Sequence, residues 1–224
     1  MERQDRITME SFEHFDLPAM SKADRNKLLV SLVLPRPIAW VTSKDANGVL
    51  NAAPFSFFNA ISSDPPMVVI GIGVQPDREV KDTLANIRAR REFVVNLVPE
   101  ELAEAMNVTA TNVPRGMDET LLAGLELADG AVVDVPRIAG SPVALECRLY
   151  EVLEPGGGST IVLGRVVYMH VRESAFANRE RLHIDAEKLR LIGRMSGAGG
   201  YCTTRDMFVI ERKSWPLDVA DSGA

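Results

Sequence analysis

Short segments of apolar and β-branched residues, separated by Pro, Gly and Asn, occupy most of the first half of this chain and predict β-strands. Ile38–Ser43 is the first of them, and Pro35 and Pro37 stand before it, where a proline leaves strand pairing intact. Asp45–Gly48 is predicted as a tight turn, because its Asn-Gly pair tolerates positive φ angles. Val49–Phe55 is therefore expected to be the returning strand of a hairpin.

Further apolar runs predict more strands along the chain. Met67–Val74 is apolar almost throughout, which is typical of a strand buried on both faces, and Glu92–Val98 follows it after a helical segment. Val143–Leu153 and Thr160–Val171 are long β segments joined by a Gly-rich loop, so we expect them to form a hairpin. Met207–Ile210 is expected to be a short final strand.

Helical spacing is confined to a few segments. Val80–Arg90 places apolar residues at i, i+4 and i+7 with charges on the opposite side. Glu100–Met106 is expected to be a short helix entered through a proline, and Ala186–Ile192 another helix. Residues 107–140 are expected to have little regular structure. Because strands and helices do not alternate regularly, the sequence predicts a mainly β fold, an antiparallel β-barrel with peripheral helices.

Composition narrows the classes of protein. With 224 residues the chain is long enough for one domain with a sizeable core, and a division into two small domains stays open. Its net charge of −6 argues against nucleic acid or a membrane surface as partner. No apolar run is long enough to span a bilayer, and the charged N-terminus does not look like a secretory signal. Cys147 and Cys202 match no metal-ligand spacing, so we expect free thiols, no metal and a cytoplasmic location.

The candidate functional residues lie at strand ends and at the start of the predicted helix over residues 80–90. Small hydroxyl and amide side chains are dense there, and a helix N-terminus attracts anions through its amide groups and dipole. Lys81 adds a full positive charge, so the pattern predicts a phosphate site. Two plainer interpretations stay open: the segment is only a helix start, and Trp40 and the nearby phenylalanines are core residues. For Trp40 we favour the core. The hydroxyl and amide residues are Thr42, Ser43, Ser56, Asn59 and Thr83.

Three linked segments resemble the motif series of the flavin reductase-like, FMN-binding split β-barrel family. They read PRPIAWVTS from residue 35, APFSFFN from residue 53 followed by SSDPP, and KDTLANI from residue 81 running into EFVVNLV. Their order and spacing also agree with the family, and the resemblance extends over about residues 28–210. It implies one domain over residues 1–224 with peripheral termini, and a split barrel of antiparallel, Greek-key-like topology.

The resemblance also implies a homodimer that holds FMN without a covalent bond in a groove at the subunit interface. In the family, NAD(P)H is the co-substrate that passes hydride to the flavin, and a redox partner protein such as a monooxygenase can receive reduced flavin. The motifs carry cofactor contacts to three groups of residues. The ribityl chain and the ring are expected at Thr42, Ser43, Ser56, Phe57 and Asn59, and Ala53 is a further cofactor contact. The phosphate is expected at Lys81 and Thr83, with Asp82 ordering that turn. A looser Gly-Arg…Tyr match adds Arg194 and Tyr201.

The leading interpretation is therefore an NAD(P)H-dependent FMN reductase. No catalytic residue is assigned, because hydride transfer needs no acid–base side chain, and His14, His170 and His183 are scattered without ligand spacing. Two alternatives stay open. One is a non-enzymatic electron carrier that keeps its FMN, and the other is a flavin- or haem-related binding protein on the same fold.

Overall fold

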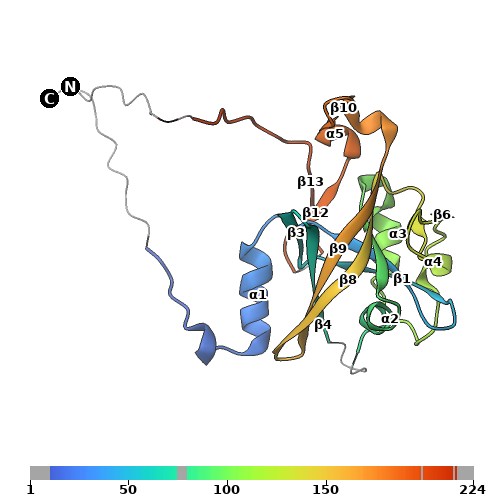
Figure 1. Cartoon of the computed structure of the whole chain (residues 1–224). Coiled ribbons are helices and arrows are strands. Elements are labelled where there is room, and N and C mark those ends of the chain that lie inside the picture. Colours follow the sequence, from blue (N-terminus) through green and yellow to red (C-terminus); the bar gives the residue numbers. More distant parts are fainter. Residues whose placement is uncertain (1–10, 75–79, 198, 214, 216–224) are drawn as a thin grey trace.

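The computed structural model describes residues 11–74, 80–197, 199–213 and 215. Within these ranges the largest element is a seven-stranded antiparallel sheet in the order β2-β1-β5-β8-β9-β4-β3, shown with its peripheral helices in Figure 1. The fold is a mainly β split barrel, as predicted. Its strands are β1 (Ala39–Lys44), β2 (Leu50–Phe55), β3 (Phe58–Ser63), β4 (Pro66–Gly73), β5 (Glu92–Leu97), β8 (Val143–Gly156) and β9 (Ser159–Val171).

Short helices and two-stranded sheets surround this sheet. The α-helices are α1 (Lys22–Leu32), α2 (Asp82–Arg90), α3 (Ala103–Val108), α4 (Glu119–Leu122) and α5 (Ala186–Leu189). The 3-10 turns are η1 (Leu17–Ala19), η2 (Glu100–Leu102) and η3 (Glu173–Ala175). The small sheets pair β6 (Leu127–Ala128) with β7 (Arg137–Ile138), β10 (Phe176–Asn178) with β11 (His183–Ile184), and β12 (Ile192–Arg194) with β13 (Tyr201–Thr203). None of the helices in the described ranges is long and apolar enough to cross a lipid bilayer.

The predicted hairpin between β1 and β2 is confirmed, and its turn has the expected chemistry. Asp45 Oδ1 accepts hydrogen bonds from the backbone N–H groups of Asn47 and Val49, each at 2.8 Å. Gly48 follows with a φ of +86°, a conformation that favours glycine. This turn fixes the register of the two strands, in which Ser43 faces Asn51 across the ladder. The β8–β9 hairpin and helix α2 are confirmed in the same way.

Strand β4 differs from the prediction, because only one of its faces is buried. Val68, Ile70 and Ile72 face the main core with at most 2% of each residue exposed. Val69 and Gly71, on the opposite face, are only partly covered and line an open groove. The prediction of burial on both faces was wrong because apolar composition alone does not reveal that one side of a strand lacks a second layer.

Trp40 belongs to the core, as predicted. It is fully buried in a cluster with Ile38, Met106 and Ile192, on the side of β1 opposite the main core. Its indole Nε1–H donates to Thr109 Oγ1 at 2.9 Å. A buried indole needs such an acceptor, so Trp40 also fixes the start of the loop that follows α3.

The C-terminal prediction was wrong. Met207–Ile210 pairs with no strand among the described residues and lies exposed, with 84% of Phe208 and 91% of Val209 accessible. An apolar run becomes a strand only where another strand offers free backbone groups, and none lies beside it. The predicted helix over Ala186–Ile192 is also shorter than expected, since α5 ends at Leu189. Helix α1 and strand β3 were not predicted. The apolar residues of α1 do not gather on one face, so its sequence gives no helical periodicity, and the helix buries no residue.

The long segment over residues 107–140 has little regular structure, as predicted, but it is anchored at a buried carboxylate. Glu146 of β8 is fully buried and accepts hydrogen bonds from the backbone N–H groups of residues 131–133 at 2.6–2.9 Å. Its Oε1 lies 2.6 Å from His170 Nε2 on β9. Burial alone would raise the pKa of Glu146, but these hydrogen bonds hold it below its usual value. The loop is thereby tied to the barrel.

Candidate functional site

A polar cleft, here called the β2 cleft, runs along β2 between the start of α2 and the loop after α3. Its first part is a small hollow of about 80 Å³, and its second part, of about 240 Å³, shares Pro54 and Ala110 with the first. The first part is lined by Asn51, Ala53, Pro54, Lys81, Asp82, Thr83, residues 109–113 and Glu119. The second is lined by Ile38, Pro54, Ser56, Met106, Asn107, Ala110, Arg194 and Tyr201.

Lys81 stands at the N-cap of α2 and faces the first hollow. Its ammonium lies 5.5 Å from the centre of the Phe55 ring, and burial lowers the pKa of Lys81. Among the described residues no carboxylate pairs with it. Lys81 is partly removed from water and stands at the positive end of the dipole of a nine-residue helix, so this position favours the binding of an anion.

The carboxylates around this hollow are engaged elsewhere. Asp82 Oδ1 lies 3.1 Å from Arg115 Nε, and Arg115 also donates to the Val80 carbonyl, so the loop after α3 is fastened to the start of α2. Glu119 accepts hydrogen bonds from the Asn51 side chain and from the backbone N–H of Ala52. Burial raises the pKa of Glu119, and the nearby Asp82 adds to the increase.

Asn51 is the centre of a buried hydrogen-bond network. Its Nδ2 donates to both carboxylate oxygens of Glu119 at 2.9 Å, and its Oδ1 accepts from Thr83 Oγ1 at 2.7 Å and from Ser43 Oγ at 3.3 Å. Asn86 Nδ2 in turn donates to Ser43 Oγ at 3.1 Å. The network joins β1, β2, α2 and α4 through groups that are almost completely buried.

This network changes the roles of two predicted site residues. The hydroxyl protons of Ser43 and Thr83 are donated to Asn51, so neither hydroxyl can donate to a phosphate, which only accepts hydrogen bonds. Ser43 is fully buried and does not line the cleft, whereas Thr83 lines it. Thr42 lies on the other face of β1, where its hydroxyl donates to the Pro136 carbonyl at 2.7 Å. The structure therefore does not bring the Thr42 and Ser43 side chains to the cleft.

The other predicted residues gather around the cleft or beside it. Arg194 and Tyr201 lie opposite each other on the β12–β13 pair, with the guanidinium 4.7 Å from the ring centre. Phe57 and Asn59 line an adjoining groove, which meets the cleft at Ser56. The predicted residues that line the cleft itself are Ala53, Ser56, Lys81, Asp82, Thr83, Arg194 and Tyr201.

Sequence reasoning missed Asn51, Glu119 and the loop over residues 109–113. The loop carries a visible signal, since Thr109–Asn112 is dense in hydroxyl and amide groups directly after a helix. Asn51 and Glu119 carry none, because a single Asn in a strand and a single Glu in a helix are ordinary surface residues until tertiary contacts bury them.

Comparisons with known proteins agree with this architecture. Residues 31–189 match the family described as flavin reductase like domain. The structure superposes on Pseudomonas fluorescens 2-nitrobenzoate 2-nitroreductase with a TM-score of 0.83 and 33% identity, covering 92% of this chain and all of that one. It superposes on nitrilotriacetate monooxygenase component B from Bacillus cereus with a TM-score of 0.84 and 32% identity, covering 90% of this chain and all of that one. An NADH:riboflavin 5'-phosphate oxidoreductase of Streptomyces pristinaespiralis is 28% identical over 142 residues, 63% of this chain and 74% of that protein.

The Asn51 network predicts a pH-dependent loss of stability in Asn51→Asp. The change places a second buried carboxylate against Glu119, and two such groups cannot both ionise at low cost. We expect the free energy of unfolding to fall by about 3–5 kcal/mol near pH 8. Because the pair's pKa is raised in the folded state, that state binds more protons than the unfolded chain as the pH falls, so the deficit should shrink near pH 5. Urea unfolding at both pH values measures this. Asn178→Asp is the control, because Asn178 is exposed and its side-chain oxygen accepts a hydrogen bond from the Arg181 backbone N–H, as a carboxylate also can. A deficit that does not change with pH would contradict the network.

Proposed function

This chain belongs to the family of flavin reductase-like domains, and from that premise we propose that it is an NAD(P)H-dependent oxidoreductase that reduces FMN held non-covalently in the β2 cleft. The observation that carries the proposal is Lys81, a desolvated cation at the start of α2 without a carboxylate partner among the described residues. A phosphate group supplies the charge that this position lacks.

The residues at this end of the cleft fit a phosphate. Lys81 provides a charge-assisted hydrogen bond, and as the N-cap residue it gives the first-turn amides no side-chain acceptor of its own. The two nearby carboxylates are held by Asn51 and Arg115, so they do not pair with the Lys81 ammonium. Riboflavin 5'-phosphate, the flavin in the name of the Streptomyces relative, carries such a group.

The second part of the cleft suits a flat ring system. Pro54 and Ala110, which line this part as well as the first, present small side chains, which leaves room for a ring to approach the backbone. Arg194, stacked on Tyr201, provides positive charge at this end, where a reduced flavin ring carries negative charge. A bound flavin supplies the redox chemistry by accepting hydride from NAD(P)H, while the protein binds and orients it.

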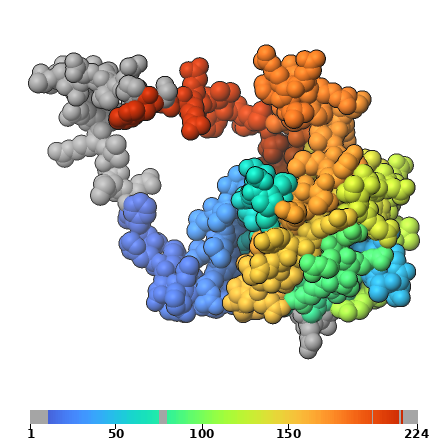
Figure 2. Space-filling view, viewed as in Figure 1, coloured from blue at the N-terminus to red at the C-terminus, as the bar shows by residue number. Residues whose placement is uncertain are grey.

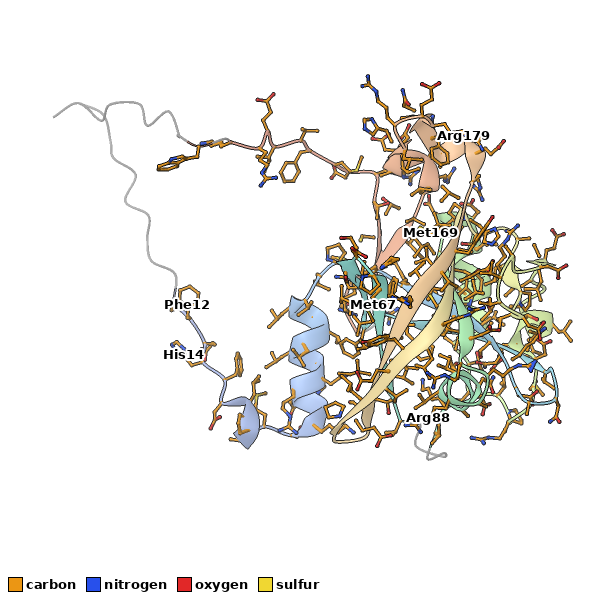
Figure 3. All side chains as sticks on the ribbon, in the orientation of Figure 1. Phe12, His14, Met67, Arg88, Met169 and Arg179 are labelled. Carbon is orange, nitrogen blue, oxygen red and sulfur yellow. The ribbon has the colours of Figure 1, made fainter. Side chains whose placement is uncertain are left out.

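We further propose that the protein is a homodimer and that it supplies reduced flavin to a separate redox partner protein. The cleft lies on one side of a single barrel, so a flat ring in it keeps one face uncovered, and tight binding requires burial of most of the ligand surface. Apolar side chains lie exposed on separate segments, among them Met169 on β9 (Figure 3) and Phe208. The likeness to a monooxygenase component B supports an oxygenase as the partner that receives reduced flavin.

If the protein is a reductase, the complex with FMN should be yellow and should lose its colour within seconds of adding NADH or NADPH without oxygen. Absorbance at the flavin maximum follows the reaction, and dithionite gives the fully reduced reference. Bleaching by dithionite but by neither nucleotide would refute the reductase and favour a carrier that receives electrons from another protein.

The proposed dimer predicts a mass in solution of twice the 24.5 kDa of one chain. Light scattering coupled to size-exclusion chromatography measures it on the FMN-loaded protein. A mass of one chain with flavin still bound would show that a single barrel covers the ring adequately.

Lys81→Ala should weaken FMN and spare riboflavin. A charge-assisted contact is worth about 1.5–3 kcal/mol, so FMN affinity should fall roughly ten- to a hundredfold. Riboflavin, which has no phosphate, should bind wild type and variant equally. Thermal stability should not fall, since a cation at a helix N-terminus opposes the dipole. Isothermal titration with both flavins measures the difference.

Two control variants make the Lys81 experiment specific. Arg88→Ala removes a cation from the far end of α2, where Arg88 pairs with Glu154, and should leave both affinities unchanged. Thr83→Ala breaks the hydrogen bond to Asn51 and should weaken FMN and riboflavin together. An equal loss of both flavins in Lys81→Ala would mean that the phosphate binds elsewhere.

A further inference from the structure

A second and larger hollow, here called the α1 groove, lies on the open face of β4. Its volume is about 630 Å³, and it meets the β2 cleft at Ser56, which lines both. Figure 2 shows its walls, with α1 in blue beside the tip of the β8–β9 hairpin and the teal segment of β3. Lys22 Nζ donates to the Gly157 carbonyl at 2.8 Å, which joins α1 to the hairpin tip.

The lining of the α1 groove is mostly apolar and carries positive charge only. Phe57 lies against β4 at Gly71, where an added Cβ would approach Phe57 Cβ to 2.9 Å, so glycine is required for this contact. The charged residues are Lys22 and Arg36, and the described lining contains no carboxylate. In a chain with a net charge of −6, such a groove is electrostatically distinct. The remaining lining comes from residues 26, 33, 35, 37, 56, 58, 59, 69, 72–74, 155 and 158–161.

Arg36 is the unusual member of this lining, because only 5% of it is exposed and no carboxylate accompanies its charge among the described residues. Its Nη1 donates to the carbonyls of Val30, Val33 and Met195, and its Nε to Ser56 Oγ at 3.4 Å. No described residue accepts a hydrogen bond from its Nη2. Burial lowers the pKa of Arg36, and the nearby Arg194 lowers it further. A buried guanidinium with an unused donor is well suited to a carboxylate.

We propose that the α1 groove binds an apolar organic carboxylate, with its carboxylate group at Arg36, its apolar body along β4 and Phe57, and Lys22 at the rim. The groove supplies what this class of ligand needs: apolar contact area, a buried cation without a counter-ion, and no competing acid among its described residues. This inference deepens the proposed function and rests on it. A ligand in the α1 groove lies beside Ser56, which also lines the end of the β2 cleft where we propose that flavin binds. Its test does not depend on flavin.

The test is isothermal titration of the full-length protein with 2-naphthoate and with the neutral 2-naphthamide. We expect naphthoate to bind at least about fivefold more tightly, which corresponds to about 1 kcal/mol. Lys22→Glu should weaken naphthoate about tenfold and leave naphthamide unchanged. Lys27→Glu, on the same helix but outside the groove, should change neither ligand more than about twofold. Equal binding of the two ligands by wild type, or equal effects of the two variants, would overturn the proposal.

Arg36→Met tests the deeper contact. We expect it to abolish the preference for naphthoate over naphthamide, with near-UV circular dichroism as the check on folding. If the variant does not fold, the comparison of Lys22→Glu with Lys27→Glu decides alone. If naphthoate does not bind, the proposal is also overturned. In that case, a shift from dimer to monomer in Lys22→Glu would indicate that a second copy of the chain occupies the α1 groove. Loss of FMN binding with naphthoate preference intact would refute only the proposed function.

Discussion

The amide of Asn51 must satisfy hydrogen bonds to three other buried side chains, and each of these comes from a different element. Ser43 belongs to β1, Thr83 to α2 and Glu119 to α4. Each bond is buried, so a shift of α2 along β2 would leave polar groups without partners in a dry environment, at a cost of about 1–3 kcal/mol for each group. This requirement fixes where α2 begins, and therefore where Lys81 presents its charge. The site's geometry thus depends on residues that need not touch a ligand.

Charge is distributed unevenly around this junction. The acids near the cleft are held by neighbours, with Asp82 against Arg115 and Glu119 against Asn51. Lys81, Arg194 and Arg36, by contrast, have no carboxylate partner among the described residues. The two hollows that meet at Ser56 therefore form a positive region in a protein whose net charge is negative. Concave surfaces focus such a field and raise the local concentration of anionic ligands.

The ends of the chain are attached less firmly than the barrel. Helix α1 buries no residue, and Arg36 joins its last turn to the segment after β12 through backbone carbonyls. Beyond these attachments both terminal segments extend away from the sheet, as Phe12 and His14 show at the N-terminal side in Figure 3. Phe12 and Phe208, on these segments, are 81% and 84% exposed with respect to the residues that the structure describes.

Elements whose signals are local could be predicted from the amino-acid sequence. The Asn-Gly turn, the apolar strands, the long hairpin and the start of α2 at Lys81 all follow from neighbouring residues, and the linked motifs identified the split-barrel fold. Which polar groups contact one another depends on the packing of the elements and could not be predicted. Ser43 and Thr83 carry the hydroxyls expected at a phosphate site, yet Asn51 takes both, because residues far apart in sequence become neighbours only when β2 packs against α2. The apolar run over residues 207–210 failed as a strand for the same reason, since strand formation requires a partner edge that no local pattern encodes.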